Sequence, residues 1–409
     1  MNSKIITVVL LLWPAGAQAA DVLTLEKAVQ EVLAANQDVQ AAGYRIEAAK
    51  ARIPQAKALD DPMVGVTFED VPLDTADVTK GEKINYRVEQ KLPFPGKRHV
   101  RGKAARFDAE AVSEGSRGRV QDILLDLKST YYDLYRLDRS LAVNRETQAL
   151  LRQFLGSTEE AYAAGKTSAD APLKAQVELS KLQNEEVLLD QERQTHMAHL
   201  KALLNHENHR DDPRLPSNLS WPRLSASLEE MEAMASESRP ELGALRALEK
   251  RDVAKVTSAK QSVIPDFAFA FEYNQVPNSI DHWTGTAAIN VPIYFGKNRG
   301  QIREAKASLK ATQAEHQSLE VHTRHEIEQA YSAVKAAQKI VGSYQSKILP
   351  QAKTTLEASR LAYASSKVDF LTLIDAARTY KDLQMSFYEN QARLGTSFAE
   401  LERLVGRNL

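Results

Sequence analysis

A short segment of this sequence occurs twice. The first copy reads KLPFPGKR at residues 91–98, and the second reads NVPIYFGKNR at residues 290–299. Gly96-Lys97 and Gly296-Lys297 are 200 positions apart, and the same offset aligns apolar residues with apolar residues farther along. Matches over nearly the whole chain indicate an internal duplication, so the fold must accommodate two similar halves.

The duplication sets the expected domain organisation. The first copy is expected over residues 21–212 and the second over residues 225–409. Residues 213–224 lie between them, and their prolines in a polar sequence are typical of a linker.

Residues 1–20 have the layout of a secretory signal peptide. Lys4 is followed by an apolar run and then by small residues that end in Ala-Gln-Ala. The run is about half of the roughly 20 residues that span a bilayer, which argues against a membrane anchor. We expect cleavage after Ala19 or Ala20 and export of the mature chain.

The composition excludes several classes of protein. The chain has no cysteine, so its exported form must be stabilised by packing rather than by disulfides. A content of 43% hydrophobic and 26% charged residues indicates a globular rather than a disordered chain. The formal net charge of −1 gives no indication of nucleic-acid binding.

Two pairs of strands are predicted from alternating apolar and polar residues. They lie at about residues 62–70 and 83–92 in the first copy and at about 265–274 and 283–292 in the second. Such alternation indicates strands with two different faces. Each pair fits either a hairpin half-buried in a soluble core or two strands of a transmembrane barrel.

Long helices that turn back once are predicted over residues 97–205 and again over 297–405. Apolar residues recur there at intervals of three and four, which indicates one narrow stripe on each helix. A helix of about 65 residues would extend on the order of 100 Å. A shorter polar helix is expected before each strand pair, over residues 24–58 and about 226–263.

The number of strands bears on whether the sheet could lie in a membrane. A sheet in lipid must close on itself, because an open edge would leave unpaired backbone groups in hydrocarbon. The smallest barrels have about eight strands, whereas one chain offers only about four. Three chains would supply about twelve strands.

At this point the sequence resembles the outer-membrane efflux protein family, the TolC-like exit ducts. The similar segments are QKLPFPGKR (90–98), YAAGKTSAD (162–170) and YASSKVDFLTLIDAARTY (363–380), and the resemblance extends over residues 21–409. The first segment is most similar to the heavy-metal branch, which serves cobalt–zinc–cadmium and copper–silver pumps.

The resemblance implies a mainly α fold with a small transmembrane β part. A homotrimer would form a twelve-stranded β-barrel in the outer membrane of a Gram-negative bacterium and a long α-helical barrel across the periplasm. It implies a periplasmic adaptor (membrane fusion) protein and an inner-membrane, proton-driven RND-type transporter as partners. Members of the family conduct and do not catalyse, so no cofactor is expected.

The resemblance also implies which residues form the periplasmic tip. Asp375 matches a position where the family commonly has an aspartate facing the pore. Thr372 stands where a second pore aspartate is often found, so a single acidic ring is expected. Ser366 stands where the family has a glycine in the second turn. Lys367 is a candidate partner for Asp375 on spacing. The candidates for adaptor contact are Tyr162, Gly165, Lys166, Tyr363 and Ser366, and those for the gate are Asp375, Asp369, Lys367 and Asp170. A solvated helix end is the alternative interpretation for each charge.

Two other functions, a zinc protease and a soluble coiled-coil protein, each fit only part of the sequence. His322 and His325 read H-x-x-H-E, which differs from the H-E-x-x-H of zinc proteases and favours a solvated helix face. A weak role in handling metal cations is the alternative for these histidines. A soluble periplasmic coiled-coil protein, structural or adaptor-like, would explain the long helices. It would not explain two-faced strand pairs that recur in phase with them. LPFPGKR favours heavy-metal cations as cargo, with drugs as the alternative.

Overall fold

The computed structural model describes residues 22–74, 77–164, 169–206, 212–221, 223–277 and 279–409. The expected signal peptide lies outside the described residues, as do Gly165 and Lys166. The chain forms two compact units. Unit 1 comprises Met1–Ala34, Thr130–Trp221 and Ser346–Ala392, and unit 2 comprises Ala35–Ser129, Pro222–Gln345 and Arg393–Leu409. Each unit therefore takes residues from both copies of the duplicated sequence.

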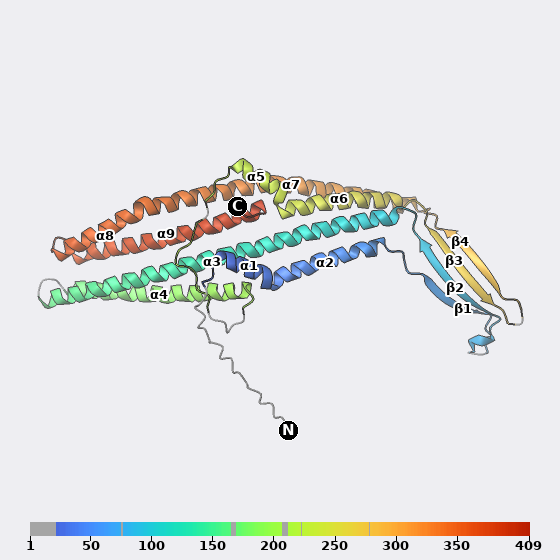
Figure 1. The fold of residues 1–409 in the computed structure, drawn as a ribbon, viewed down its shortest axis with the longest axis horizontal. Coiled ribbons are helices and arrows are strands. Elements are labelled where there is room, and N and C mark those ends of the chain that lie inside the picture. Colours follow the sequence, from blue (N-terminus) through green and yellow to red (C-terminus); the bar gives the residue numbers. More distant parts are fainter. Residues whose placement is uncertain (1–21, 75–76, 165–168, 207–211, 222, 278) are drawn as a thin grey trace, which may run out of the picture. The chain divides into compact units, whose positions relative to one another are not determined.

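Four strands form one antiparallel sheet within unit 2 (Figure 1). They are β1 (Met63–Glu69), β2 (Lys83–Leu92), β3 (Phe267–Gln275) and β4 (His282–Ile289). The order β1-β2-β3-β4 joins the two predicted hairpins through β2 and β3, whose register pairs Val88 with Phe271. This joining was not predicted. It leaves β1 and β4 as the two edges of the sheet.

The short helix expected at the start of each copy is broken into two. In the first copy, α1 (Leu25–Ala35) and α2 (Gln37–Lys57) are separated at Asn36, whose side chain accepts hydrogen bonds from two amides of α2. In the second copy, α5 (Leu228–Ser238) ends before Pro240, the first residue of α6 (Pro240–Gln261). Asparagine as an N-cap and proline in the first turn both favour a new helix start over continuation.

The long helices follow the predicted pattern. In the first copy they are α3 (Lys97–Ala163, 67 residues) and α4 (Asp170–Leu203). In the second they are α7 (Phe295–Ser343), α8 (Leu349–Ala364) and α9 (Phe370–Val405). A π-helical turn at Tyr344–Ile348 separates α7 from α8, just before Pro350. Such turns accommodate a residue that cannot continue the normal hydrogen-bond ladder.

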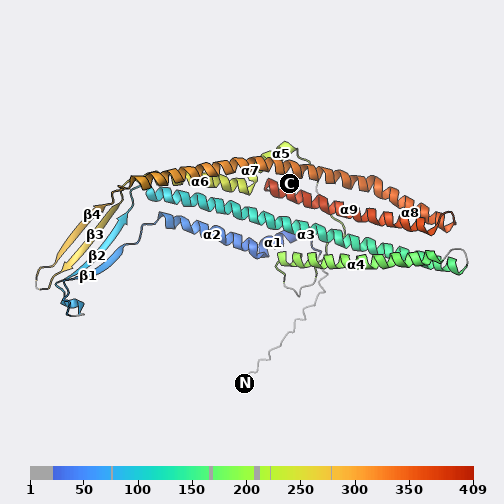
Figure 2. The same cartoon turned by 180° about the vertical axis from the view of Figure 1, so that it is seen from behind.

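The apolar stripe of α3 is buried, as its spacing predicts. Leu127, Tyr131, Leu134 and Leu137 have no measurable exposure. Other helices also lie side by side within a unit: α6 beside α7 in unit 2, and α8 beside α9 in unit 1 (Figures 1 and 2). None of the helices in the described ranges contains an apolar stretch that could span a lipid bilayer.

Candidate functional site

The turn between α8 and α9 in unit 1 is closed by a specific backbone arrangement. The Lys367 amide donates to the Ala362 carbonyl at 2.8 Å, and the Ser366 amide donates to the Tyr363 carbonyl at 2.9 Å. Ser366 has a φ of 57°, so it adopts the left-handed conformation that usually calls for glycine. These are the bonds of a Schellman helix end. Serine therefore forms a turn in which helices usually have glycine.

Tyr363 and Phe370 connect this turn to the core of unit 1. Their ring centroids are 5.6 Å apart, and Phe370 is 5% exposed. Burial raises the pKa of the Tyr363 phenol. The core beneath contains residues of α3, α4, α8 and α9: Leu151, Phe154, Ala171, Ala175, Leu182, Leu356, Leu373, Ile374 and Ala377. The predicted adaptor-contact residue Tyr363 is thus also a packing residue.

Asp369 caps α9. Its Oδ1 accepts hydrogen bonds from the Thr372 amide at 2.9 Å and from the Thr372 hydroxyl at 2.5 Å. Both bonds lower the pKa of Asp369, and the bond from the Thr372 hydroxyl has the larger effect. Thr372 is thereby engaged at the start of its own helix. Asp369 consequently has a structural role in addition to its negative charge.

The other turn follows α3, which ends at Ala163, and precedes α4, which begins at Asp170. Tyr162 is 52% exposed. The Asp170 carboxylate accepts a hydrogen bond from Lys174 at 2.8 Å, one helical turn away, and this bond lowers the pKa of Asp170. An acidic residue in the first turn of a helix also interacts favourably with the helix dipole.

Asp375 lies on the first turns of α9 and pairs with Arg378 rather than with Lys367. Its Oδ1 is 3.3 Å from Arg378 Nη1, and the Asp375 side chain is 59% exposed. Among the described residues, no ion pair joins Asp375 to Lys367 within one chain, and their pairing in an assembled tip stays a prediction. Arg378 is favoured because it lies three residues later, on the same face of the helix.

Arg378 also crosses to α4. Its Nε donates to Glu178 Oε1 at 2.7 Å and its Nη2 donates to Glu178 Oε2, which forms a two-point ion pair. Hydrogen bonding to Arg378, against the opposing effect of burial, lowers the pKa of Glu178. Seven residues along α4, Glu185 pairs with Lys381 at 2.8 Å. Two ion pairs therefore fasten α9 to α4 near the two turns.

Sequence reasoning missed these two ion pairs, although a signal was present. Glu178 and Glu185 are seven residues apart, and Arg378 and Lys381 are three apart, so each set lies on one helix face. Both helices run away from their turns, so the acid nearer its turn pairs with the base nearer its turn, although the two spacings differ. The missing information was which faces of α4 and α9 meet.

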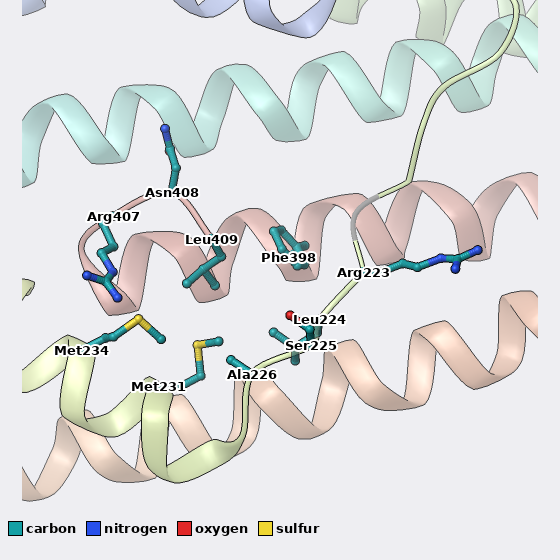
Figure 3. A pocket seen from close by; sticks show the side chains of 10 residues that line it. All are labelled: Arg223, Leu224, Ser225, Ala226, Met231, Met234, Phe398, Arg407, Asn408 and Leu409. Carbon is teal, nitrogen blue, oxygen red and sulfur yellow. The ribbon is translucent and has the colours of Figure 1, made fainter.

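No metal centre is found in the described part of the chain, where no cluster of three or more His, Cys, Asp or Glu side chains is placed to hold an ion. His322 and His325 are exposed on α7, in agreement with a solvated helix face. Unit 2 has a hollow of about 380 Å³ at the end of the chain (Figure 3). It is lined by residues 223–226, Met231, Met234, Phe398 and residues 407–409.

Unit 2 holds a small sheet with exposed apolar side chains, and unit 1 holds long paired helices with charged turns. The sequence model of the family described as "Outer membrane efflux protein" matches residues 28–206 and 233–407. The chain belongs to this family. It is an outer-membrane channel that extends into the periplasm, and it is not an enzyme.

Solved structures share the fold at low sequence identity. CusC is 16% identical with a TM-score of 0.81, and the alignment covers 94% of this chain and 92% of CusC. VceC from Vibrio cholerae is 17% identical with a TM-score of 0.77 and coverages of 94% and 96%. The open state of MtrE from Neisseria gonorrhoeae is 16% identical with a TM-score of 0.79 and coverages of 94% and 89%. A search of curated proteins returned no match. The soluble coiled-coil alternative gains no support from these comparisons.

Proposed function

We propose that three copies of this chain assemble into the exit duct of a tripartite efflux system. The observation that carries the proposal is the four-stranded sheet, whose edge strands β1 and β4 have no partner among the described residues. Exposed apolar side chains, such as Val64 at 75% and Trp283 at 70%, suit contact with lipid. Joining β4 of each copy to β1 of the next closes a barrel of about twelve strands.

The duct is passive and opens at its helical turns. A periplasmic adaptor docks at the tip residues, including Tyr162, Tyr363 and Ser366, and favours the open arrangement of the helices. A proton-driven inner-membrane transporter delivers the substrate. Direction therefore comes from the pump, because a passive channel supplies no free energy.

Asp375 is the proposed pore carboxylate. Three copies of an exposed carboxylate around one axis repel one another and attract cations. In each copy Arg378 lies 3.3 Å away and offsets part of this charge. The ring therefore controls cation entry at the closed tip.

Single-channel conductance of the detergent-purified oligomer in a planar bilayer tests this function. The wild type is expected to show a small, cation-selective conductance, and D375N is expected to lose selectivity. E357Q removes an exposed carboxylate on α8 that is not a gate candidate and serves as the matched control. A well-folded sample without a pore would refute the duct. A pore equally selective in D375N would exclude Asp375 from the gate.

The proposed cargo is heavy-metal cations, with drugs as the alternative. The proposal rests on the similarity of LPFPGKR at residues 92–98 to the heavy-metal branch of the family. A strain that lacks this chain is expected to become more sensitive to cobalt, zinc, cadmium, copper or silver salts than to hydrophobic drugs. The opposite order of sensitivities would assign the chain to drug efflux.

The mass of the exported chain tests cleavage after Ala19 or Ala20.

A further inference from the structure

The first of the two repeated junctions is locked by a lysine. Lys97 Nζ is 2.7 Å from Asp266 Oδ1 and donates to the Ile264 carbonyl at 2.6 Å. The Phe94 amide donates to the same Asp266 oxygen at 2.7 Å. Lys97 is 9% exposed. The end of β2 and the start of α3 are thereby fixed to the segment that leads into β3, the neighbouring strand.

The second junction carries the same lysine without this lock. Lys297 follows β4 as Lys97 follows β2, yet it is exposed and forms no ion pair with any described residue. The apolar residues before it are exposed as well, with Tyr294 at 72% and Phe295 at 68%. The difference arises because β2 has β3 beside it, whereas β4 is an edge of the sheet (Figure 1).

The segment that leads into β1 has the chemistry to receive this lysine. Residues 56–62 (AKALDDP) align with residues 259–265 (AKQSVIP), which places Asp61 at the position of Ile264, the acceptor of Lys97. The position of Asp266 is occupied by Met63, which offers no carboxylate. Asp61 lies two residues before Met63, and in an extended chain residues two apart point to the same side. Asp61 can therefore present a carboxylate on the side where the aligned Asp266 presents its own. Asp61 is exposed and has no ion-pair partner among the described residues.

We propose that Lys297 of one copy binds Asp61 of the next copy, as the counterpart between subunits of the Lys97–Asp266 lock. The proposal rests on the trimer put forward above, in which β4 of one copy lies beside β1 of its neighbour. The pairing of β2 with β3 inside the chain is the template for this seam. A second copy of the same chain is the occupant, because it presents an acidic residue at the aligned position.

Charge reversal tests the seam in the full-length, detergent-purified protein. K297E and D61K each place like charges together and are expected to lower the fraction of trimer that survives moderate heating in detergent several-fold. The double variant K297E/D61K restores an opposite pair and is expected to recover the wild-type fraction. D60K makes the same charge change at the adjacent residue, so K297E/D60K is the matched control and is expected not to recover.

A chemical cross-link provides the second measurement. A carbodiimide that joins amines to carboxylates is expected to link subunits in the wild type at Lys297–Asp61, as peptide mass spectrometry would identify. K297R keeps the charge and the trimer but has no amine to join, so this link is lost. A wild-type monomer would overturn both the duct and the seam. A stable trimer with no recovery in K297E/D61K, or with equal recovery in K297E/D60K, would overturn the seam alone.

Discussion

Arg378 of α9 holds Glu178 of α4 by two hydrogen bonds, one of them 2.7 Å from Nε to Oε1. The Glu178 side chain is only 8% exposed, while that of Arg378 is 42% exposed. A two-point bond between guanidinium and carboxylate is among the strongest polar contacts between side chains. This pair joins α4, which follows the turn after α3, to α9, which follows the turn after α8.

The variant R378A is expected to loosen α4 from α9. Among the described residues, it leaves the buried Glu178 carboxylate with Lys181, at 3.5 Å, as its remaining cation. We expect local stability to fall by about 1–3 kcal/mol, since a buried charge that loses its partner is poorly compensated. Hydrogen exchange of the α4 amides near Glu178 measures the change, and faster exchange is the expected result.

R360A is the control for this variant. Arg360 pairs with Glu357 on α8 at 3.0 Å, and both side chains are at least half exposed. Exposed pairs of this kind contribute about 0–1 kcal/mol. Equal exchange in R378A and R360A would show that the Arg378–Glu178 pair does not hold the helices together.

The same ion pair predicts a dependence on pH. Arg378 lowers the pKa of Glu178 from its ordinary value of 4.5, so the folded state favours the ionised carboxylate. A lowered folded-state pKa contributes stability that is fully present above 4.5 and is lost as pH falls through the folded-state value. The stability advantage of wild type over E178Q should therefore be constant above this range and shrink in acid.

Thermal unfolding of wild type and E178Q across this pH range measures the advantage. E357Q, on the exposed α8 pair, makes the same change of acid to amide and should remain close to wild type throughout. If the difference in stability between wild type and E178Q stayed constant in acid, the pKa of Glu178 would be the same in the folded and unfolded states.

The long elements were predictable because their signals are repeated many times along the chain. The stripe that contains Leu127 and Leu134 predicted a buried face on a helix of about the observed length. The breaks at Asn36 and Arg239 were not predicted, although an asparagine and a following proline both signal a helix start. These are single-residue signals inside a continuous helical pattern, and the longer pattern dominated the prediction.

The site was predictable only where it depends on local sequence. The helix ends near Tyr162 and Ser366 follow from turn residues and from the family resemblance. The intrachain partner of Asp375, Arg378, was not predicted; it lies on the same helix face and is held by Glu178. Ion pairs between α4 and α9 depend on which faces of the two helices meet. The sequence indicates those faces only when the positions of the acidic residues on α4 are compared with those of the basic residues on α9.

Ser366 provides a test of the α8–α9 turn. With a φ of 57°, it occupies a conformation that glycine adopts without steric cost. S366G is therefore expected to stabilise the end of α8 by up to about 1 kcal/mol. Slower hydrogen exchange of the Lys367 amide, which bonds to the Ala362 carbonyl, is the expected observation.

S365G is the matched control for this change. Ser365 has a φ of −94°, which any residue adopts, and its hydroxyl bonds to the Leu361 carbonyl at 3.0 Å. Glycine there removes that bond and adds freedom to the unfolded chain, so it is expected to destabilise the turn. Stabilisation by both variants, or by neither, would mean that the left-handed backbone of Ser366 carries no strain.

Asp369 allows the structural and electrostatic contributions of one residue to be separated. Asparagine caps helices about as well as aspartate, whereas alanine cannot cap. D369N and D369A both remove the negative charge, but only D369A removes the bond to the Thr372 amide, which is 2.9 Å in the wild type. We expect exchange of that amide to be near wild type in D369N and several-fold faster in D369A. If the two variants instead shared the same change in channel selectivity with unaltered exchange, Asp369 would act through its charge and belong with Asp375 in the gate.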